Sequence, residues 1–248
     1  DNRLPLLTDR APGESSSIEI RHNDHHTVIE KQGSSWQITE PVHLSANTMR
    51  IESLLRILTA PVHSSYDDTA IDTGMIGIGP TSSTLNIDGE LFRFGKANPA
   101  TGLRYIAHGD RIATIEDVYY PMVGSHFSTL VSFRLLPDDF RIASLVLPEQ
   151  TIDQDDKGRW QNNIDAGADQ VAAIINSWYD AQAFGVRQYI APANPLLSKG
   201  EIFITAVDGR QINFHIKSTD PWLILARPEL DIEYHLEGAM LQTLGGGS

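Results

Sequence analysis

The segment Trp36–Pro41 reads WQITEP, and residues 46–58 that follow it read ANTMRIESLLRIL. The first stretch alternates apolar and polar residues and predicts a β-strand that ends at Pro41, because proline cannot donate to a strand ladder. The second stretch predicts an amphipathic helix, because its apolar residues recur at i, i+3, i+4 and i+7: Ile51, Leu54, Leu55 and Leu58.

The same order returns later in the chain. Trp160 precedes a segment with the same helical stripe, formed by Val171, Ile174, Ile175 and Trp178. The offset between matching positions is 124 residues at the tryptophans, 120 at the helices and about 118 near the ends of the repeats, as loops of unequal length produce. We therefore expect an α+β protein, a tandem repeat of two similar units, each an antiparallel sheet covered by helices. The alternative is two unrelated α+β segments that share an element order.

The domain boundaries follow from this repeat. Residues 17–137 form the first expected unit and residues 138–244 the second, with Pro137-Asp138-Asp139 marking the division. Residues 1–16 mix Pro, Gly, Ser and charges without a period and predict an N-terminal tether, although its leucines offer a way to dock. The Gly-Gly-Gly-Ser of residues 245–248 is expected to be an engineered linker remnant.

Turn residues predict most of the remaining elements. Asp88-Gly89 and Asp208-Gly209 each separate two alternating segments and predict β-hairpins. The polar run 21–26 predicts another turn, and residues 63–80 a loop. The expected helices span residues 46–59 with Ser45 as N-cap, residues 117–131, residues 166–183 ended by Gly185, and residues 237–244.

Composition excludes several classes of partner and chemistry. The 248 residues carry a net charge of −13, which repels nucleic acid and anionic lipid, so neither is an expected partner. The chain has no cysteine and therefore no disulfide, thiolate metal site or thiol nucleophile. With no run of eighteen apolar residues, this sequence predicts no membrane span of its own.

Three stretches resemble ligand sites, and each is better explained as structure. His22, Asp24, His25 and His26 lie on an expected hairpin turn, where neighbours point apart and cannot supply three or four converging metal ligands. Residues 153–158 begin like a calcium loop, but Ile164 stands where the bidentate Glu is needed. Residues 74–80 have the glycine density of a phosphate loop, yet a strand follows them instead of a helix.

Catalytic patterns are equally weak. The sequence has no G-x-S-x-G elbow, and the pairs His63 with Asp67 and His108 with Asp110 are expected by chance among nine histidines and 32 acidic residues. Trp36 and Trp160 are expected in the sheet core, with a ligand groove as the alternative. The sequence thus predicts no catalytic residue, no metal ligand and no cofactor.

Several spaced motifs resemble one bacterial family. Besides W-x-I-T-x-P, they are the Leu54-Leu55 pair, Gly74 ahead of Gly79-Pro80, the strand 84–87, Phe94-Gly95, and Gly102 before Tyr105-Ile106. Over residues 17–136 this pattern resembles the family known as domain of unknown function 4340, and the second unit departs from it after Trp160. The resemblance implies an envelope protein on the periplasmic, extracytoplasmic face of the inner membrane, anchored by an N-terminal helix absent from this sequence. It also implies a link to gliding-type ABC transporter components and carries over no catalytic residues.

These observations together predict a non-catalytic adaptor or accessory subunit that binds protein partners in the cell envelope. A periplasmic module that binds a glycan or peptide in a groove between the repeats is the first alternative. A hydrolase with an unrecognised site is the second.

Overall fold

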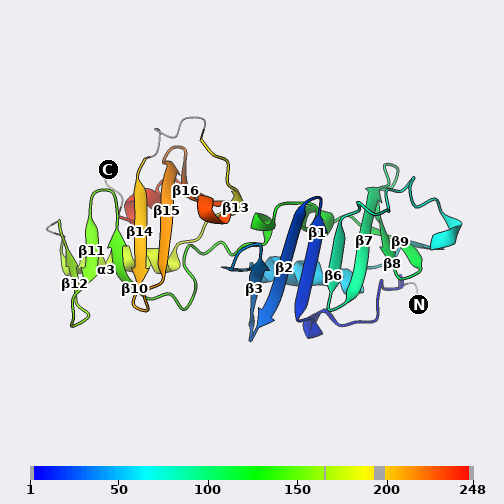
Figure 1. Ribbon diagram of the computed structural model, residues 1–248, viewed down its shortest axis with the longest axis horizontal. Helices are drawn as coiled ribbons and strands as arrows, with labels where there is room; N and C mark the ends of the chain where they lie inside the picture. Colours follow the sequence, from blue (N-terminus) through cyan, green and yellow to red (C-terminus); the bar gives the residue numbers. More distant parts are fainter. Residues whose placement is uncertain (1–2, 165, 193–198, 246–248) are drawn as a thin grey trace. The chain divides into compact units, whose positions relative to one another are not determined.

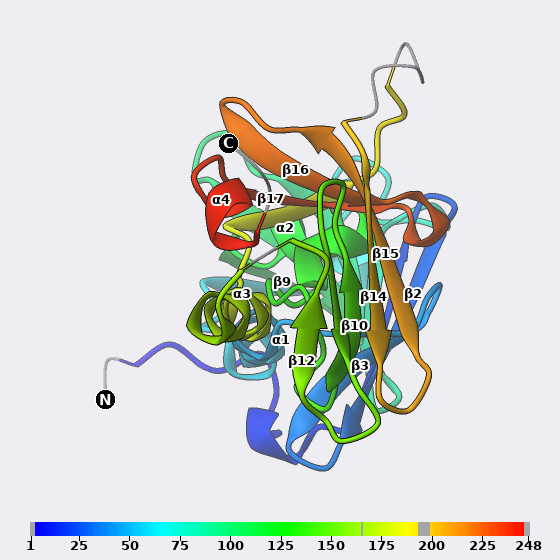
Figure 2. The ribbon, with the colours of Figure 1, turned by 90° about the vertical axis from the view of Figure 1, so that its left-hand side faces the viewer.

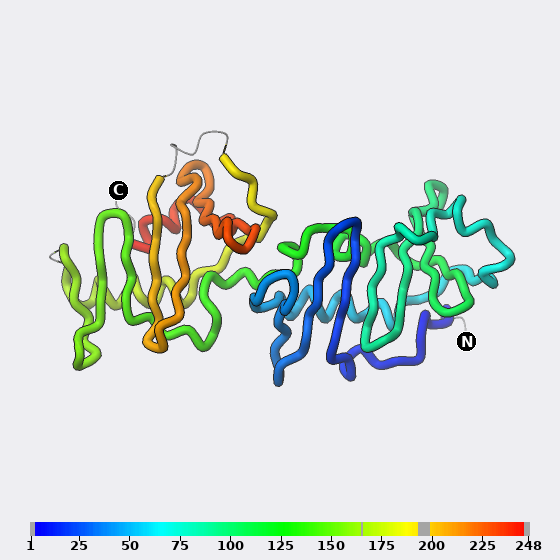
Figure 3. Tube along the Cα trace, viewed as in Figure 1, coloured from blue at the N-terminus to red at the C-terminus, as the bar shows by residue number. Residues whose placement is uncertain are grey.

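The computed structural model describes residues 3–164, 166–192 and 199–245. It divides into two compact units, Asp1–Ser132 and Phe133–Ser248, each with its own sheet (Figures 1 and 3). The division falls five residues before the expected boundary at 137/138. Of the expected linker remnant 245–248, residues 246–248 lie outside the described residues.

The first unit is built on an antiparallel sheet in the order β4-β3-β2-β1-β6-β7-β8-β9-β5. Its strands are β1 (Ser17–His22), β2 (His25–Gln32), β3 (Ser35–Glu40), β4 (Leu44–Ser45), β5 (Ser64–Asp67), β6 (Thr84–Ile87), β7 (Glu90–Ala97), β8 (Leu103–His108) and β9 (Arg111–Glu116). Its helices are α1 (Thr48–Leu55) and α2 (Tyr120–Val123), with 3-10 turns η1 (Pro12–Glu14), η2 (Arg56–Thr59), η3 (Asp68–Ala70) and η4 (Phe127–Leu130).

The second unit has a sheet in the order β12-β11-β10-β14-β15-β16-β17-β13. Its strands are β10 (Ile142–Val146), β11 (Thr151–Gln154), β12 (Trp160–Asn162), β13 (Gly185–Gln188), β14 (Glu201–Ala206), β15 (Gln211–Ser218), β16 (Trp222–Arg227) and β17 (Ile232–Glu237). Its helices are α3 (Ala168–Asp180) and α4 (Met240–Thr243), with the 3-10 turn η6 (Pro228–Leu230).

The two sheets have the same strand order apart from the short β4. In each, three antiparallel strands precede the main helix, the next strand lies at the far edge, and a four-strand meander fills the space between. Trp36 and Trp160 lie in corresponding strands, β3 and β12. The expected α+β class with antiparallel sheets is therefore confirmed.

The core of each unit forms from the residues that the periodicity singles out. In the first unit α1 buries Ile51, Leu54 and Leu55, and the sheet buries alternate residues such as Ile18 and Ile38. In the second, Trp178 of α3 is fully buried, and Figure 2 shows this helix end-on beside the strands of its sheet. Each such side chain contributes about 1.5–3 kcal/mol through burial. Trp160 differs from the expectation because it is only half-buried in the short strand β12.

Three of the expected helices have wrong limits. The one expected over residues 117–131 is only the short α2, followed by the 3-10 turn η4. The first helix starts at Thr48, and its N-cap is Asn47, whose Oδ1 accepts from the backbone N–H of Arg50 at 3.2 Å; Ser45 lies in β4 instead. The helix at α3 ends at Asp180, and Gly185 begins β13. Local propensity suggested both assignments, but strand pairing fixes the backbone of both residues, of Ser45 with Gln37 in the preceding strand β3 and of Gly185 with His235 in the distant strand β17.

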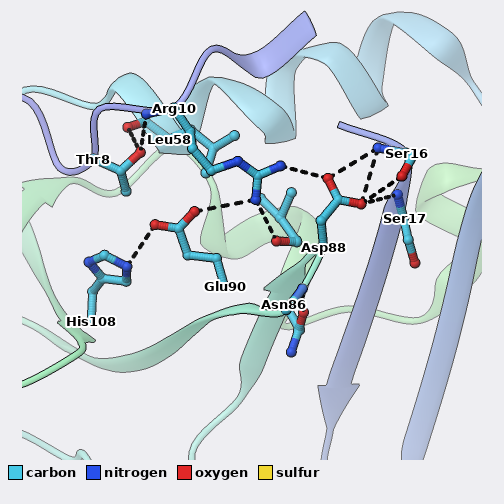
Figure 4. A network of polar contacts seen from close by, with 11 residues as sticks. Thr8, Arg10, Ser16, Ser17, Leu58, Asn86, Asp88, Glu90 and His108 are labelled. Atoms are coloured by element: carbon cyan, nitrogen blue, oxygen red, sulfur yellow. Dashed lines mark hydrogen bonds and ion pairs between the residues drawn. The ribbon is translucent and has the colours of Figure 1, made fainter. Parts of the chain in front are cut away.

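The N-terminal segment is docked, so the expectation of a free tether is wrong for its described residues. Leu7 and Thr8 donate backbone hydrogen bonds to Ala60 and Leu58, both at 2.9 Å. The guanidinium of Arg10 donates to Asp88 at 2.6 Å and to Glu90 at 3.4 Å (Figure 4). Backbone hydrogen bonds and ion pairs hold this segment in place. Docking of this kind leaves no apolar period in the sequence, so the sequence did not predict it.

Candidate functional site

A cluster of charged side chains lies on the second sheet, on the face opposite to its core, which we call the outer face. Along β17, Ile232, Tyr234 and Leu236 face the core, and burial raises the pKa of Tyr234 to about 12. Glu233 and His235 alternate with them and so face outward. Both are nevertheless buried, with 4% and 6% of their surface exposed. A buried carboxylate and imidazole on an outer face need a specific set of partners.

Lys217 of β15 supplies part of that set. Its ammonium donates to Glu233 Oε2 at 2.5 Å, and Nε2 of His235 lies 2.9 Å from Oε1 of the same carboxylate. Because a carboxylate only accepts, Nε2 of His235 carries the proton in this contact. The Lys217 ammonium also lies 5.5 Å from the ring centre of Tyr189. One carboxylate therefore joins two strands of the sheet through two charge-assisted contacts.

Two exposed aromatic side chains lie over this cluster. The ring of Phe184 is 6.3 Å from that of His235 and 5.1 Å from that of Trp222, in an edge-to-face arrangement at 67°. Phe184 and Trp222 remain 47% and 42% exposed. We call this pair the aromatic surface. Its side chains are large, apolar and backed by a buried network, which are the properties of anchor residues in interfaces.

The first unit fills the corresponding region differently. Ile112 and Thr114 of β9 pair with Ala107 and Tyr105, as Glu233 and His235 of β17 pair with Ala226 and Ile224. An apolar segment covers that face in the first unit, where Ile76 and Ile78 are buried against Ile112. The charged cluster of the second unit thus replaces an apolar contact.

Gly95 of β7 and Lys217 of β15 show the same replacement of an apolar contact by a charged one. Each follows the residue after which the register shifts, Phe94 in β7 and Ile216 in β15. A Cβ at Gly95 would lie 2.6 Å from the carbonyl oxygen of Ile76, so only glycine lets the covering segment approach this strand. At the corresponding position the second unit places a lysine that reaches Glu233.

A second candidate region is an open hollow of about 780 Å³ on the outer face of the first sheet. Polar side chains of β1, β6, β7 and nearby loops line it, among them Glu19, Arg21, Thr84, Asn86 and Arg93. Arg21 is bound to Glu19 at 2.5 Å. Burial alone would raise the pKa of Glu19, but hydrogen bonds from Arg21 and His26 outweigh it and the pKa lies below its usual value. The hollow has the composition of a solvated sheet face.

Next to this hollow, Nδ1 of His22 lies 2.7 Å from Oγ of Ser83. The side-chain nitrogen of Asn23 lies 3.0 Å from Nε2 of the same ring. With the amide donating to Nε2, the ring proton sits on Nδ1 and is donated to the serine, an assignment that follows from the hydrogen-bond network. An activated serine needs the opposite, a ring nitrogen that accepts its proton. Ser83 is also buried.

The histidines singled out in the sequence point to separate partners. His25 packs edge-to-face on His126 at 5.7 Å, while His26 lies between Glu19 at 2.8 Å and Glu40 at 3.2 Å. With His22 on Ser83, the three rings do not converge on a common point. In the part of the chain that the structure describes, no group of three or more His, Asp or Glu side chains is placed to hold a metal ion.

The other sequence candidates occupy structural positions. Asp155 accepts from the backbone and side chain of Arg159, which lower the pKa of its carboxyl, and so closes the turn that resembled a calcium loop. His108 pairs with Glu90 at 2.9 Å instead of Asp110, and Asp67 lies 3.7 Å from Arg111. Lys96 of β7 donates to the Ile76 carbonyl within the glycine-rich segment 74–80, which here covers the sheet.

Sequence reasoning missed the charged cluster and the aromatic surface. The alternation in IEYHLE, residues 232–237, does place Glu233 and His235 on one face. It gives no sign that Phe184 and Tyr189, from a separate segment, cover that face.

Among the described helices, none combines the length and apolar character needed to cross a membrane. No protein-family model matches the chain, and no curated protein or solved structure matches it either. The resemblance to the domain of unknown function 4340 family therefore stays a prediction.

Proposed function

We propose that this protein is a non-catalytic adaptor that binds a protein partner through the aromatic surface of its second unit. One observation carries the proposal: Phe184 and Trp222 pack on each other, remain exposed, and rest on the buried contacts of Glu233 with Lys217 and His235. Rigid aromatic side chains that are already ordered lose little entropy when a partner covers them, so they bind strongly for their area.

The ring geometry favours a protein over a glycan. Sugar rings stack on flat, accessible aromatic faces, whereas Phe184 and Trp222 meet at 67° and do not form one continuous flat face. The hydrolase alternative is supported only by the contact between His22 and Ser83, and the proton assignment there disfavours it.

The location and the partner class are proposals that rest on the family resemblance. We place the protein on the extracytoplasmic face of the bacterial inner membrane, as an accessory subunit of an envelope assembly linked to an ABC transporter. The net charge of −13 supports a protein partner over nucleic acid.

We further propose that the two units are copies of one ancestral unit, each a sheet covered by its main helix. The shared strand order supports this, and so do the corresponding positions of Trp36 and Trp160 and of the Asp-Gly turns after β6 and β14. The turns differ in detail, since Asp88 and Gly89 both have positive φ but only Gly209 does in the second.

Site-specific photo-crosslinking in intact cells tests the adaptor function. A photoreactive phenylalanine analogue replaces Phe184 in the full chain, and a second variant carries it at Phe203, a similarly exposed residue of β14. We expect one discrete crosslinked partner from position 184, absent from position 203 and abolished by Trp222→Ala. Equal products from both positions, or none from position 184, would contradict the proposal.

A further inference from the structure

We propose that the partner presents a basic segment to the aromatic surface, with a Lys or Arg side chain over Trp222 between the carboxylates of Asp220 and Glu237. This inference rests on the proposed adaptor function and adds the chemistry of the partner.

One carboxylate lies beside the exposed indole, and a second is close to it in the sequence. Glu237 is the cross-strand partner of Trp222 in the pairing of β16 with β17, so their Cβ atoms are about 4.5–5.5 Å apart. Asp220 precedes Trp222 by two residues, and both acids are exposed. Within the described part of the chain, neither carboxylate has a hydrogen bond or ion pair. The Glu237 carboxylate therefore borders the indole, and Asp220 adds a second unneutralised negative charge two residues before it in the chain.

The basic side chains closest to Trp222 in the sheet either pair with another carboxylate or lie far from Glu237. Lys217 binds Glu233 at 2.5 Å, and Arg227 binds Glu229 at 2.9 Å. Arg187 pairs in register with Glu233, four residues along β17 from Glu237, which is about 13 Å at the rise of a strand. The protein itself thus leaves the position over Trp222 open to an external cation.

An aromatic face beside carboxylates is a favourable site for such a cation. The ring quadrupole attracts an ammonium or guanidinium, and adjacent carboxylates add direct ion pairing. The second unit carries nine basic against sixteen acidic side chains, a net charge of −7, so its long-range field also draws a basic segment. An acidic partner segment would be repelled both by the adjacent carboxylates and by the long-range field of the unit.

Titration of the full chain with two short synthetic peptides tests the inference. One peptide alternates Lys with Leu and the other Glu with Leu, and binding is followed by the indole NMR signal of Trp222, assigned with Trp222→Phe. We expect the Lys peptide to shift this signal and the Glu peptide not to. The double variant Asp220→Asn/Glu237→Gln should weaken the Lys peptide about tenfold.

The matched control is Asp153→Asn/Asp156→Asn, which removes the same charge from two exposed residues elsewhere in the second unit. Equal weakening in both double variants would mean that net charge alone acts, and would overturn the inference. So would a Glu peptide that binds as tightly as the Lys peptide.

The crosslinked cell partner separates this inference from the adaptor proposal. We expect the crosslink yield at position 184 to fall in the variant Asp220→Asn/Glu237→Gln. In isolated membranes, the yield from the chain without these substitutions should also fall as the salt concentration rises from about 0.1 M to 1 M, because the Debye length shrinks from about 10 Å to 3 Å. A yield that resists both changes would overturn the basic partner while leaving the adaptor function intact. If position 184 gives no crosslink even in the chain that keeps Asp220 and Glu237, the adaptor function itself would be rejected.

Discussion

Glu233 connects the buried and exposed halves of the candidate site. Its two oxygens contact Lys217 and His235, and the ring of Phe184 packs on His235. A buried ion pair adds little net stability, because desolvation offsets the Coulomb attraction, but it fixes side-chain positions. The position of the aromatic surface therefore depends on a residue that a partner would not touch.

Replacing Glu233 by Gln should lower the free energy of unfolding of the second unit by about 2 kcal/mol, because the partly buried Lys217 ammonium, 20% exposed, loses its counter-charge and His235 loses a charged acceptor. Urea denaturation of the full chain measures it. The control is Glu201→Gln, which breaks the more exposed contact of Glu201 with His215 and should cost less than about 1 kcal/mol. Equal losses in the two variants would show that the cluster is effectively solvated.

Residues whose conformation is set locally were predictable from the sequence. Asp88 and Gly89 have positive φ, at 49° and 93°, as their two-residue hairpin requires. Trp36 is buried, as its place in an alternating segment suggests. Trp160 is not, because β12 is only three residues long and lies at a sheet edge. Burial there depends on neighbours that the local sequence does not show.

Long periodic segments were predicted, and short edge elements were not. The stripe of α3 and the alternation of β7 and β15 are strong because many residues share one face. β5 and β13 are four-residue edge strands, SSYD and GVRQ, with little alternation, and both exist only by pairing with the last strand of their sheet. The N-terminal segment is similar, since its position depends on residues 58–62 and on Asp88.

Asp88 makes the docking of that segment depend on pH. Burial alone would raise the pKa of its carboxyl, but hydrogen bonds from Arg10, Ser16 and Ser17 outweigh this and lower it. A carboxyl whose folded-state pKa lies below its unfolded value stabilises the fold above the unfolded value, and that stability is lost as pH falls through the folded value.

Asp88→Asn should therefore lower the melting temperature at neutral pH and reduce its fall between about pH 5 and pH 2, the range over which such carboxylates take up protons. Thermal melts of both proteins across this range measure the effect. Asp156→Asn, an exposed turn residue in the other unit, should leave the pH profile of the parent chain unchanged. A profile for Asp88→Asn parallel to that of the parent would contradict the docking role of this carboxylate.

The two units share a strand order and differ in what lies over the end of the meander. Ile76 and Ile78 close that face in the first unit, whereas the second has charged residues beneath an aromatic pair. A sheet that is already stable tolerates such a change, because its core is on the other face. The same fold can therefore be closed by an apolar segment in one unit and carry the proposed binding surface in the other.

Each unit should fold alone, because in the described chain every sheet pairing lies within one unit and each has its own buried core. We expect fragments 1–132 and 133–248 each to give a β-rich circular dichroism spectrum and a single cooperative unfolding transition. Fragment 133–248 should also bind the Lys-Leu peptide as tightly as the full chain, since Asp220, Trp222 and Glu237 all lie within it. A fragment 133–248 that is folded but binds much more weakly would show that the first unit contributes to the surface.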